Sequence, residues 1–311
     1  MSPRGRRRSR PDFSHRIEYV LLRIGAAFLA LLPSFAHAPV ARFLGGVWFY
    51  LFPMRKGVVL ENLTRAFPNR SPHWRRRTAR RCFEHFARMM GFEFPAMLRF
   101  TPDDFRTWLP RIDGREYYDA LHLSGKPWIF VSGHLGNWEL GVARFAAIEK
   151  NQTTVLAKPL HNPLVENLVA RVRAARGYEV VHTRGNMRPV VAAVNQGRTL
   201  AFLTDQDARR NGILVPFFGV PASTAQGPAF FAHRFNLPIL VGVCVREENK
   251  DVYRMRFYPP IIPNPDADRD AEIQRMTREH VALLESAIRE TPEQYFWFHR
   301  RWKTQVQEMQ T

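Results

Sequence analysis

The decapeptide Ser132-Gly133-His134-Leu135-Gly136-Asn137-Trp138-Glu139-Leu140-Gly141 joins two segments of different character. The apolar run at 126–131 that precedes it is typical of a buried strand, and the spacing of apolar residues over 137–148 predicts a helix. Ser132 and Gly133 mark a sharp exit from the strand. The sequence therefore predicts a strand, turn and helix in succession, the unit from which α/β folds are built.

This corner carries a histidine five positions before a carboxylate. With His134 in the turn and Glu139 in the first helical turn, we expect the carboxylate to fold back onto the imidazole. Such a contact fixes the tautomer of the ring and stabilises the imidazolium, while the other ring nitrogen accepts a proton from an alcohol. Gly133 and Gly136 would allow a substrate close to the backbone, whose amides would bind an oxyanion. A core histidine beside a solvated glutamate is the alternative interpretation.

Two other histidines stand at the same spacing from an acid. The chain has 11 histidines and 28 acidic residues, for which about one such pair is expected by chance. His280 and Glu285 lie in a continuous helical pattern, where five residues separate them by about 140°. His161 and Glu166 straddle an Asn-Pro helix start, so Glu166 is explained as a first-turn acid. The pair in the turn is therefore the catalytic candidate.

The charge balance points to anionic partners. The 311 residues include 46 Lys and Arg against 28 Asp and Glu, a formal net charge of +18. Nucleic acid, acidic phospholipid and phosphorylated substrates all fit such a balance. Cys82 and Cys244 lie far apart without metal-ligand spacing, which favours buried free thiols in a reducing compartment and no metal site. The sequence also lacks the serine-elbow, zinc-protease, Walker and dinucleotide motifs.

The N-terminus favours a membrane. A basic tail over residues 1–14 precedes an apolar run at 17–32, the arrangement of a segment held on the cytoplasmic side. Arg23 and Pro33 interrupt this run, so a single spanning anchor and monotopic insertion both stay open. A cleaved signal peptide is disfavoured because the chain continues apolar over 40–52. Nucleic-acid binding by the tail is not favoured, since no aromatic-interleaved RNA motif accompanies it.

Composition divides the rest of the chain into three regions. We expect a membrane-anchoring helical segment at 15–52, a helical region at 53–110 and an α/β domain at 111–311. The helical region contains an amphipathic helix, whose basic face is either simply solvated or in contact with lipid headgroups. Its arginines and its apolar stripe are Arg75, Arg76, Arg77, Arg80 and Arg81, and Phe83, Phe86, Met89 and Met90.

The α/β region shows alternating strand and helix patterns. The predicted strands are 128–131, 153–157, 179–182, 199–204, 239–245 and 253–258. The predicted helices are 137–148, 163–176, 187–196, 224–235 and 268–290.

Five ordered segments together resemble a known family. They are 58–68, Gly133-His134-Leu135-Gly136-Asn137-Trp138-Glu139, the run 204–227, the ending 297–303 and the N-terminal anchor. The chain is similar along nearly its whole length to the lipid A biosynthesis acyltransferases, the late lauroyl and myristoyl transferases of the glycerolipid acyltransferase superfamily. The resemblance implies a central mixed β-sheet flanked by helices, preceded by an N-terminal membrane-associated helical segment.

The resemblance also implies an activity. It is the transfer of an acyl chain from acyl-carrier protein or acyl-CoA to a hydroxyl of an anionic membrane lipid, a lipid A precursor, at the cytoplasmic face of the inner membrane. His134 matches the base of the family and Glu139 its paired carboxylate. No cofactor, metal or nucleic-acid partner is implied.

Further residues match substrate-binding positions of the family. Arg173 matches an arginine that holds phosphate or the thioester region, although a helix-surface charge is the alternative. Asp205 would orient Arg173 or the substrate, or cap the next turn. The run 217–227 resembles a loop that lines the acyl tunnel, with core packing as the alternative for its phenylalanines. The remaining candidates are Gly136, Asn137, Gln206 and Lys158.

One departure from the family concerns Lys158, which stands where many members carry arginine, so that a point charge replaces a bidentate contact. The acceptor therefore stays open, and mannosylated phosphoinositides, other glycolipids, ornithine lipids and lysophospholipids are alternatives. A hydrolase that uses the same residues on water is a further alternative. A non-enzymatic basic protein that binds membranes or nucleic acid is the rival from another class.

Overall fold

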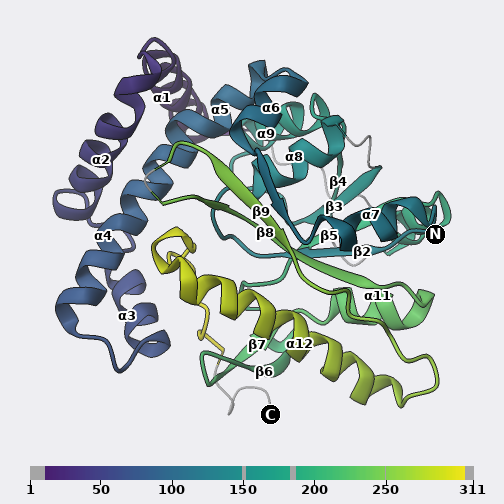
Figure 1. Ribbon diagram of the computed structural model, residues 1–311. Coiled ribbons are helices and arrows are strands. Elements are labelled where there is room, and N and C mark those ends of the chain that lie inside the picture. Colours follow the sequence, from purple (N-terminus) through teal and green to yellow (C-terminus); the bar gives the residue numbers. More distant parts are fainter. Residues whose placement is uncertain (1–10, 149–151, 183–186, 249, 305–311) are drawn as a thin grey trace.

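A mixed β-sheet forms the centre of the protein (Figure 1). The computed structural model describes residues 11–148, 152–182, 187–248 and 250–304. Within these residues the sheet has seven strands in the order β1-β9-β8-β2-β5-β3-β4. The strands are β1 (Arg111–Asp113), β2 (Ile129–Ser132), β3 (Thr153–Ala157), β4 (Glu179–His182), β5 (Thr199–Leu203), β8 (Ile239–Arg246) and β9 (Tyr253–Phe257). The predicted mixed sheet is thus confirmed.

The strands at the centre run parallel, and β9 pairs antiparallel with β8. All four residues of β2 are buried, as are the first seven of β8. Continuous apolar strands of this kind belong to parallel sheets that are covered on both faces. The six predicted strands are present with ends shifted by at most one residue. β1 and the separate hairpin of β6 (Ile213–Phe217) and β7 (Val220–Thr224) were not predicted.

Helices cover both faces of the sheet. On one face Phe105, Tyr118 and Phe145 pack with Phe130 and Phe257 of the sheet, and these three come from α6, α7 and α8. On the other face α10, α11 and α12 pack against β2, β5 and β8. The helices are α1 (Phe13–Ala30), α2 (Ser34–Tyr50), α3 (Lys56–Ala66), α4 (Pro72–Arg88), α5 (Phe94–Ala96), α6 (Pro102–Trp108), α7 (Arg115–Leu123), α8 (Trp138–Ile148), α9 (Pro163–Ala174), α10 (Arg188–Asn195), α11 (Gly227–Phe235) and α12 (Arg269–Glu290).

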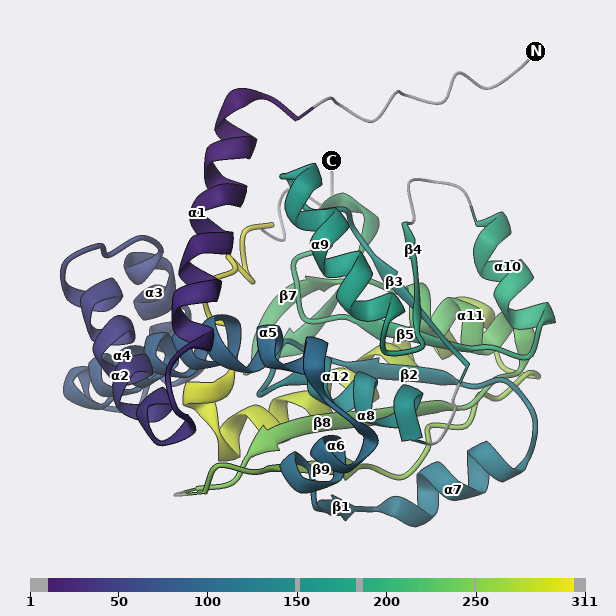
Figure 2. The same cartoon turned by 90° about the horizontal axis from the view of Figure 1, so that it is seen from above.

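The N-terminal helices gather beside the sheet, and α1 stands out from the body of the molecule (Figure 2). The apolar run predicted as one anchor is interrupted near Pro33, so that α1 and α2 are separate helices. In the part of the chain that is described, no helix has both the length and the apolarity to cross a bilayer. The predicted spanning anchor is therefore not supported. The arginines of the basic tail up to Arg10 lie outside the described residues.

Helix α4 has the predicted amphipathic character. Ser71 caps its first turn, and Pro72 takes the position where a missing amide has least effect. Phe83 and Phe86 are buried in the core that joins α4 to the C-terminal segment, whereas Met90 of the predicted stripe is exposed. The helix continues into one π-helical turn, Met89–Glu93.

Both cysteines are buried and free, as predicted. Cys82 lies in α4 and Cys244 in β8. Burial raises the pKa of each thiol well above its ordinary value. These thiols are therefore structural rather than reactive.

Candidate functional site

The sheet topology brings two polar residues to one edge. β2 and β5 are parallel neighbours, with Ser132 level with Leu203. The amide of Thr204 still donates to the Ser132 carbonyl at 3.1 Å, so the residues that follow the two strands lie side by side. His134 follows β2 and Asp205 follows β5. Their positions are set by strand register, although 71 residues separate them along the chain.

Asp205 holds His134 through two hydrogen bonds. The His134 backbone amide donates to Oδ2 at 2.9 Å, and Nδ1 lies 2.8 Å from Oδ1. Burial opposes ionisation of Asp205, but the electrostatic attraction of His134 and the hydrogen bonds from it hold the net pKa of the carboxyl below its usual value. The side chain of Asp205 is 2% exposed, whereas that of His134 is 19% exposed. An ionised partner on Nδ1 leaves Nε2 as the acceptor nitrogen.

Glu139 has other partners than the predicted one. Its Oε1 accepts from Nη2 of Arg173 at 2.5 Å, and its Oε2 accepts from Nε of Arg173 at 3.2 Å and from the Tyr178 hydroxyl at 2.7 Å. Burial opposes ionisation here too, but the charge of Arg173 holds the net pKa of Glu139 below its ordinary value. The predicted fold-back onto the imidazole is thus replaced by an ion pair, although Glu139 still interacts electrostatically with His134.

The same geometry decides between alternative interpretations of two charged residues. Arg173 is not simply a surface charge, since its side chain is only 18% exposed and forks onto Glu139. Asp205 neither orients Arg173 nor merely caps a turn, because both of its oxygens face His134. The reason is the strand order, which places β5 directly beside β2.

Gly136 and Asn137 are enclosed by the protein through their backbone amides. Both are buried, and their amides donate to carbonyls of Gln294 and Cys244 at 3.0 and 2.8 Å. Gly136 has a φ of +62°, and a Cβ there would lie 1.9 Å from the Cys244 carbonyl oxygen. Only glycine fits this approach.

The predicted oxyanion site is wrong for three of the amides over 133–136. The amide of Leu135 donates to the Gly133 carbonyl, that of Gly136 to the Gln294 carbonyl and that of His134 to Asp205. Each donor is engaged within the protein because the turn is folded tightly against its neighbours. These three amides are therefore not free to bind an oxyanion.

Gln206 and Lys158 lie at the same edge of the sheet as His134. Gln206 directly follows Asp205 and is half-buried, whereas Lys158 directly follows β3 and is exposed. β3 is the second strand from β2, which corresponds to roughly 10 Å at the usual strand spacing. Both residues stay candidates for contact with a bound substrate.

The C-terminal segment closes one side of the site. The Phe296 amide donates to the His134 carbonyl at 2.9 Å, and the Tyr295 hydroxyl donates to the Asp205 carbonyl at 3.3 Å. The rings of Phe296 and Trp138 lie 5.8 and 4.8 Å from the imidazole. The sequence marked this segment by its aromatic and basic composition but gave no reason to place it against His134.

The two other histidine pairs are structural, as predicted. Glu166 lies in the first turn of α9, which begins at Pro163 after the capping Asn162. His280 is fully buried in α12, while Glu285 accepts a hydrogen bond from the Phe218 amide.

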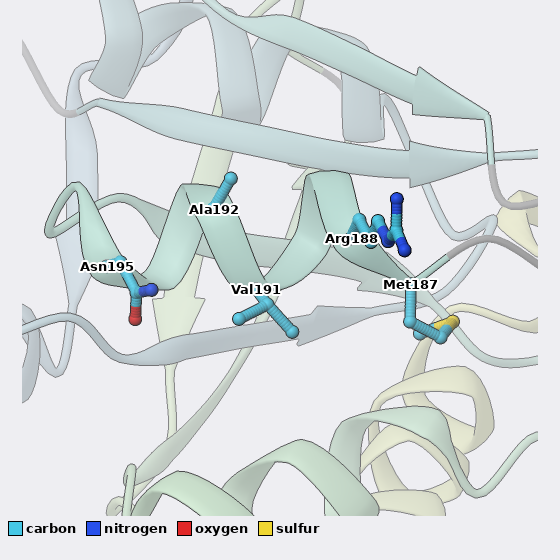
Figure 3. Close-up of a pocket in the computed structure, with 5 residues that line it drawn as sticks. All are labelled: Met187, Arg188, Val191, Ala192 and Asn195. Atoms are coloured by element: carbon cyan, nitrogen blue, oxygen red, sulfur yellow. The ribbon is translucent and has the colours of Figure 1, made fainter.

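Two further apolar features are the predicted tunnel loop and a surface pocket. Phe217 and Phe218 of the predicted tunnel loop are buried in the core of the β6–β7 hairpin and the C-terminal segment, so core packing is the interpretation that holds. A surface pocket of about 560 Å³ runs along α10, and none of the predicted site residues lines it (Figure 3). Its lining residues are Met187, Arg188, Val191, Ala192 and Asn195.

Comparison with known proteins identifies the family of this chain. The model of the family described as bacterial lipid A biosynthesis acyltransferase matches residues 7–304, nearly the whole chain. The chain belongs to this family. It is therefore an acyltransferase, and the resemblance seen in the sequence is confirmed.

Two relatives of this acyltransferase are similar over most of their length, and a third is similar over less than half. Lipid A biosynthesis lauroyltransferase of Escherichia coli (strain K12) is 26% identical over 302 residues, which are 94% of this chain and 96% of the relative. Lipid A biosynthesis palmitoleoyltransferase of the same organism is 27% identical over 253 residues, 80% of this chain and 79% of the relative. Phosphatidylinositol mannoside acyltransferase of Mycobacterium tuberculosis (strain ATCC 25618 / H37Rv) is 26% identical over 137 residues, 43% of each chain.

Proposed function

We propose that this acyltransferase moves a fatty acyl chain from an acyl thioester to a hydroxyl of a lipid A-type glycolipid. The observation that carries the proposal is the pairing of the partly exposed His134 with the buried Asp205 at the carboxyl edge of the sheet. Open α/β sheets bind their ligands at this edge. The family to which the chain belongs supplies the reaction type.

The proposed step uses His134 as a general base. Nε2 takes the proton of the acceptor hydroxyl while the oxygen attacks the carbonyl carbon of the thioester. Collapse of the tetrahedral intermediate breaks the bond between carbon and sulfur, and the imidazolium returns the proton to the leaving thiolate. An ester and a thiol result, so the reaction balances with the thioester donor as its only co-substrate and calls for no further cofactor.

The two carboxylates have separate tasks in this proposal. Asp205 fixes the ring through Nδ1 and stabilises the imidazolium directly. Glu139 adds negative charge near the ring and is itself fixed by Arg173. The predicted role of Glu139 as support for the imidazolium is therefore kept as an electrostatic contribution.

The acceptor and donor are proposed from charge and from the relatives. Two relatives that are named for lipid A biosynthesis match 80% and 94% of this chain. Lys158 would meet an acceptor phosphate as an exposed point charge. The net charge of +18 favours an anionic donor such as acyl-carrier protein or acyl-CoA. The mycobacterial relative makes a mannosylated phosphoinositide the alternative acceptor.

We also propose that α1 and α2 dock on the cytoplasmic face of the inner membrane without spanning it. The two helices expose many large apolar side chains, which favours contact with a membrane surface. These are Phe13, Ile17, Val20, Leu21, Leu22, Ile24, Phe28, Phe35, Phe43 and Tyr50.

Vesicle flotation tests this docking. Leu21→Glu and Phe28→Glu should each weaken binding to anionic phospholipid vesicles at least tenfold, because burial of such a side chain contributes roughly 1.5–3 kcal/mol. Leu123→Glu, a change at a leucine on α7 that is more exposed than Leu21 or Phe28, should leave flotation unchanged. Equal effects of all three changes would contradict a specific docking face.

Lipid mass spectrometry tests the function. We expect lipid A from a strain that lacks the protein to be lighter by one acyl chain, and complementation to restore the mass. A strain complemented with His134→Ala should keep the lighter lipid, whereas His73→Ala, at an exposed histidine of α4, should restore it. A mass shift in phosphoinositide mannosides instead would identify the other acceptor. If no lipid in any fraction gains an acyl chain when the protein is present, the proposal is overturned.

A further inference from the structure

A buried glutamate outside the site is tied to the catalytic turn. Glu93 is 1% exposed and ends the π-helical turn that follows α4. A single π-helical turn in an α-helix corresponds to one inserted residue, which redirects the side chains, and such turns are frequent at functional sites. Here it brings a carboxylate from the N-terminal helices under the turn that carries His134.

Four donors converge on the Glu93 carboxylate. Oε1 accepts from Nε of Arg88 at 3.0 Å and from the guanidinium of Arg246. Oε2 accepts from the Tyr253 hydroxyl at 2.5 Å and from Nδ2 of Asn137 at 3.1 Å. Burial opposes ionisation, but Arg246 holds the net pKa of Glu93 below its ordinary value. The carboxylate therefore stays charged and orders groups from α4, β8, β9 and the turn.

One arm of this cluster is the direct contact with Asn137. The side-chain oxygen of Asn137 accepts a hydrogen bond from the Leu140 amide at 3.0 Å, which caps the start of α8. Glu93 thus orients the Asn137 side chain, and Asn137 in turn caps the start of α8. That helix carries Glu139 in its first turn.

A second arm reaches the turn through β8. The backbone of Arg246 exchanges two hydrogen bonds with the side chain of Gln294, at 2.8 and 3.0 Å. The carbonyl of Gln294 in turn accepts the Gly136 amide at 3.0 Å. Both arms therefore end within three residues of His134.

We propose that Glu93 is a positioning residue for acyl transfer, which holds the turn from His134 to Asn137 in its reactive geometry through Asn137 and Arg246. The inference rests on the proposed function of His134. Its physical basis is the free-energy cost of burying charged groups. A buried carboxylate held by two arginines contributes little net stability, so stability alone does not explain it. A small displacement of a reacting group, by contrast, lowers the rate strongly.

Two variants separate positioning from folding. Glu93→Gln removes the charge but keeps the size, and Asn137→Ser cuts the contact with Glu93 while leaving a hydroxyl that caps α8. Glu290→Gln is the matched control, because it breaks a carboxylate to arginine pair with Arg256 on β9 at the surface. Each purified full-length variant is assayed for kcat and for KM of donor and acceptor, and for deuterium uptake in peptides covering residues 134–140.

We expect kcat to fall by about 10- to 100-fold in both variants, with KM values within about twofold of wild type. Deuterium uptake should rise over 134–140 while the peptides of β8 and α12 stay protected. Glu290→Gln should change neither quantity. The inference is overturned if either folded variant keeps kcat within about twofold of wild type, or if protection is lost equally throughout the sheet. If the wild type transfers no acyl chain, the proposed function fails, and the exchange measurement still decides whether Glu93 orders the turn.

Discussion

Replacement of Asp205 by asparagine tests which carboxylate supports the imidazole of His134. The wild-type side chain accepts two N–H groups of His134, one from the backbone and one from the ring. The two N–H groups meet different oxygens of Asp205. An amide places an oxygen at only one of these two positions and an NH2 group at the other, so in this geometry it accepts only one of them. When that oxygen takes the backbone amide, the NH2 group faces Nδ1 and forces the ring proton onto Nε2. The nitrogen that must accept the substrate proton is then blocked.

The expected loss of rate is large because the contact between Asp205 and His134 is shielded from water. The Asp205 side chain is only 2% exposed, so water does not replace it. A hydrogen bond to a charged partner contributes roughly 1.5–3 kcal/mol, which corresponds to about 10- to 150-fold in rate. The tautomer change adds to this loss. We therefore expect kcat to fall by about 10²- to 10⁴-fold, the range of a general base.

Two measurements on one set of variants decide the matter. Single-turnover acyl transfer gives the rate, and nitrogen-15 spectra of histidine-labelled protein report the tautomer of His134. Glu139→Gln is the comparison, because both Glu139 oxygens contact Arg173 and Tyr178 rather than the ring. We expect the tautomer to change in Asp205→Asn and not in Glu139→Gln. A rate above a third of wild type in Asp205→Asn, or the opposite pattern of tautomers, would refute the reasoning.

Three further changes have defined outcomes. Gly136→Ala should lower the free energy of unfolding, measured by urea denaturation, by at least about 3 kcal/mol, because the added Cβ would lie 1.9 Å from a carbonyl oxygen of β8. Gly125→Ala is the control: Gly125 has a similar φ but open space around it, so the change should cost only about 1–2 kcal/mol. Glu139→Gln and Arg173→Gln should slow transfer to a similar extent, with the double variant no slower than either; additive losses would mean that the pair does not act as a unit. Burial lowers the folded pKa of His280 to about 3, so below the unfolded value of about 6.5 the unfolded chain binds the extra proton and stability falls by about 2 kcal/mol at pH 5. Urea midpoints of wild type and His280→Leu at pH 7 and pH 5 check this, and an equal drop in both proteins would contradict it.

The sheet domain was predictable because its local signals agree with its tertiary structure. The strands around β2 are continuous apolar runs, and the helices between them have capping residues such as Asn162. The hairpin of β6 and β7 was missed because Pro216 and Pro221 suppress a strand prediction. The same hairpin explains why the helix expected from residue 224 begins only at Gly227.

The candidate site was predictable in part. The strand and turn pattern places His134 at the carboxyl edge of the sheet. Asp205 directly follows another predicted strand, which places it at the same edge. Which carboxylate contacts the ring depends on strand order, since β5 lies beside β2 only after the sheet has formed. Glu93 carries no local signal at all, because a π-helical turn and contacts from three distant elements bring it under the site.

The rate of acyl transfer by purified His134→Ala tests the central claim most directly. It should be measured beside wild type and His73→Ala with an acyl thioester and a lipid A precursor in mixed micelles. Loss of a general base predicts a rate lower by about 10²- to 10⁴-fold, with membrane binding retained and with His73→Ala equal to wild type. A His134→Ala rate within about tenfold of wild type would contradict general-base catalysis by this histidine.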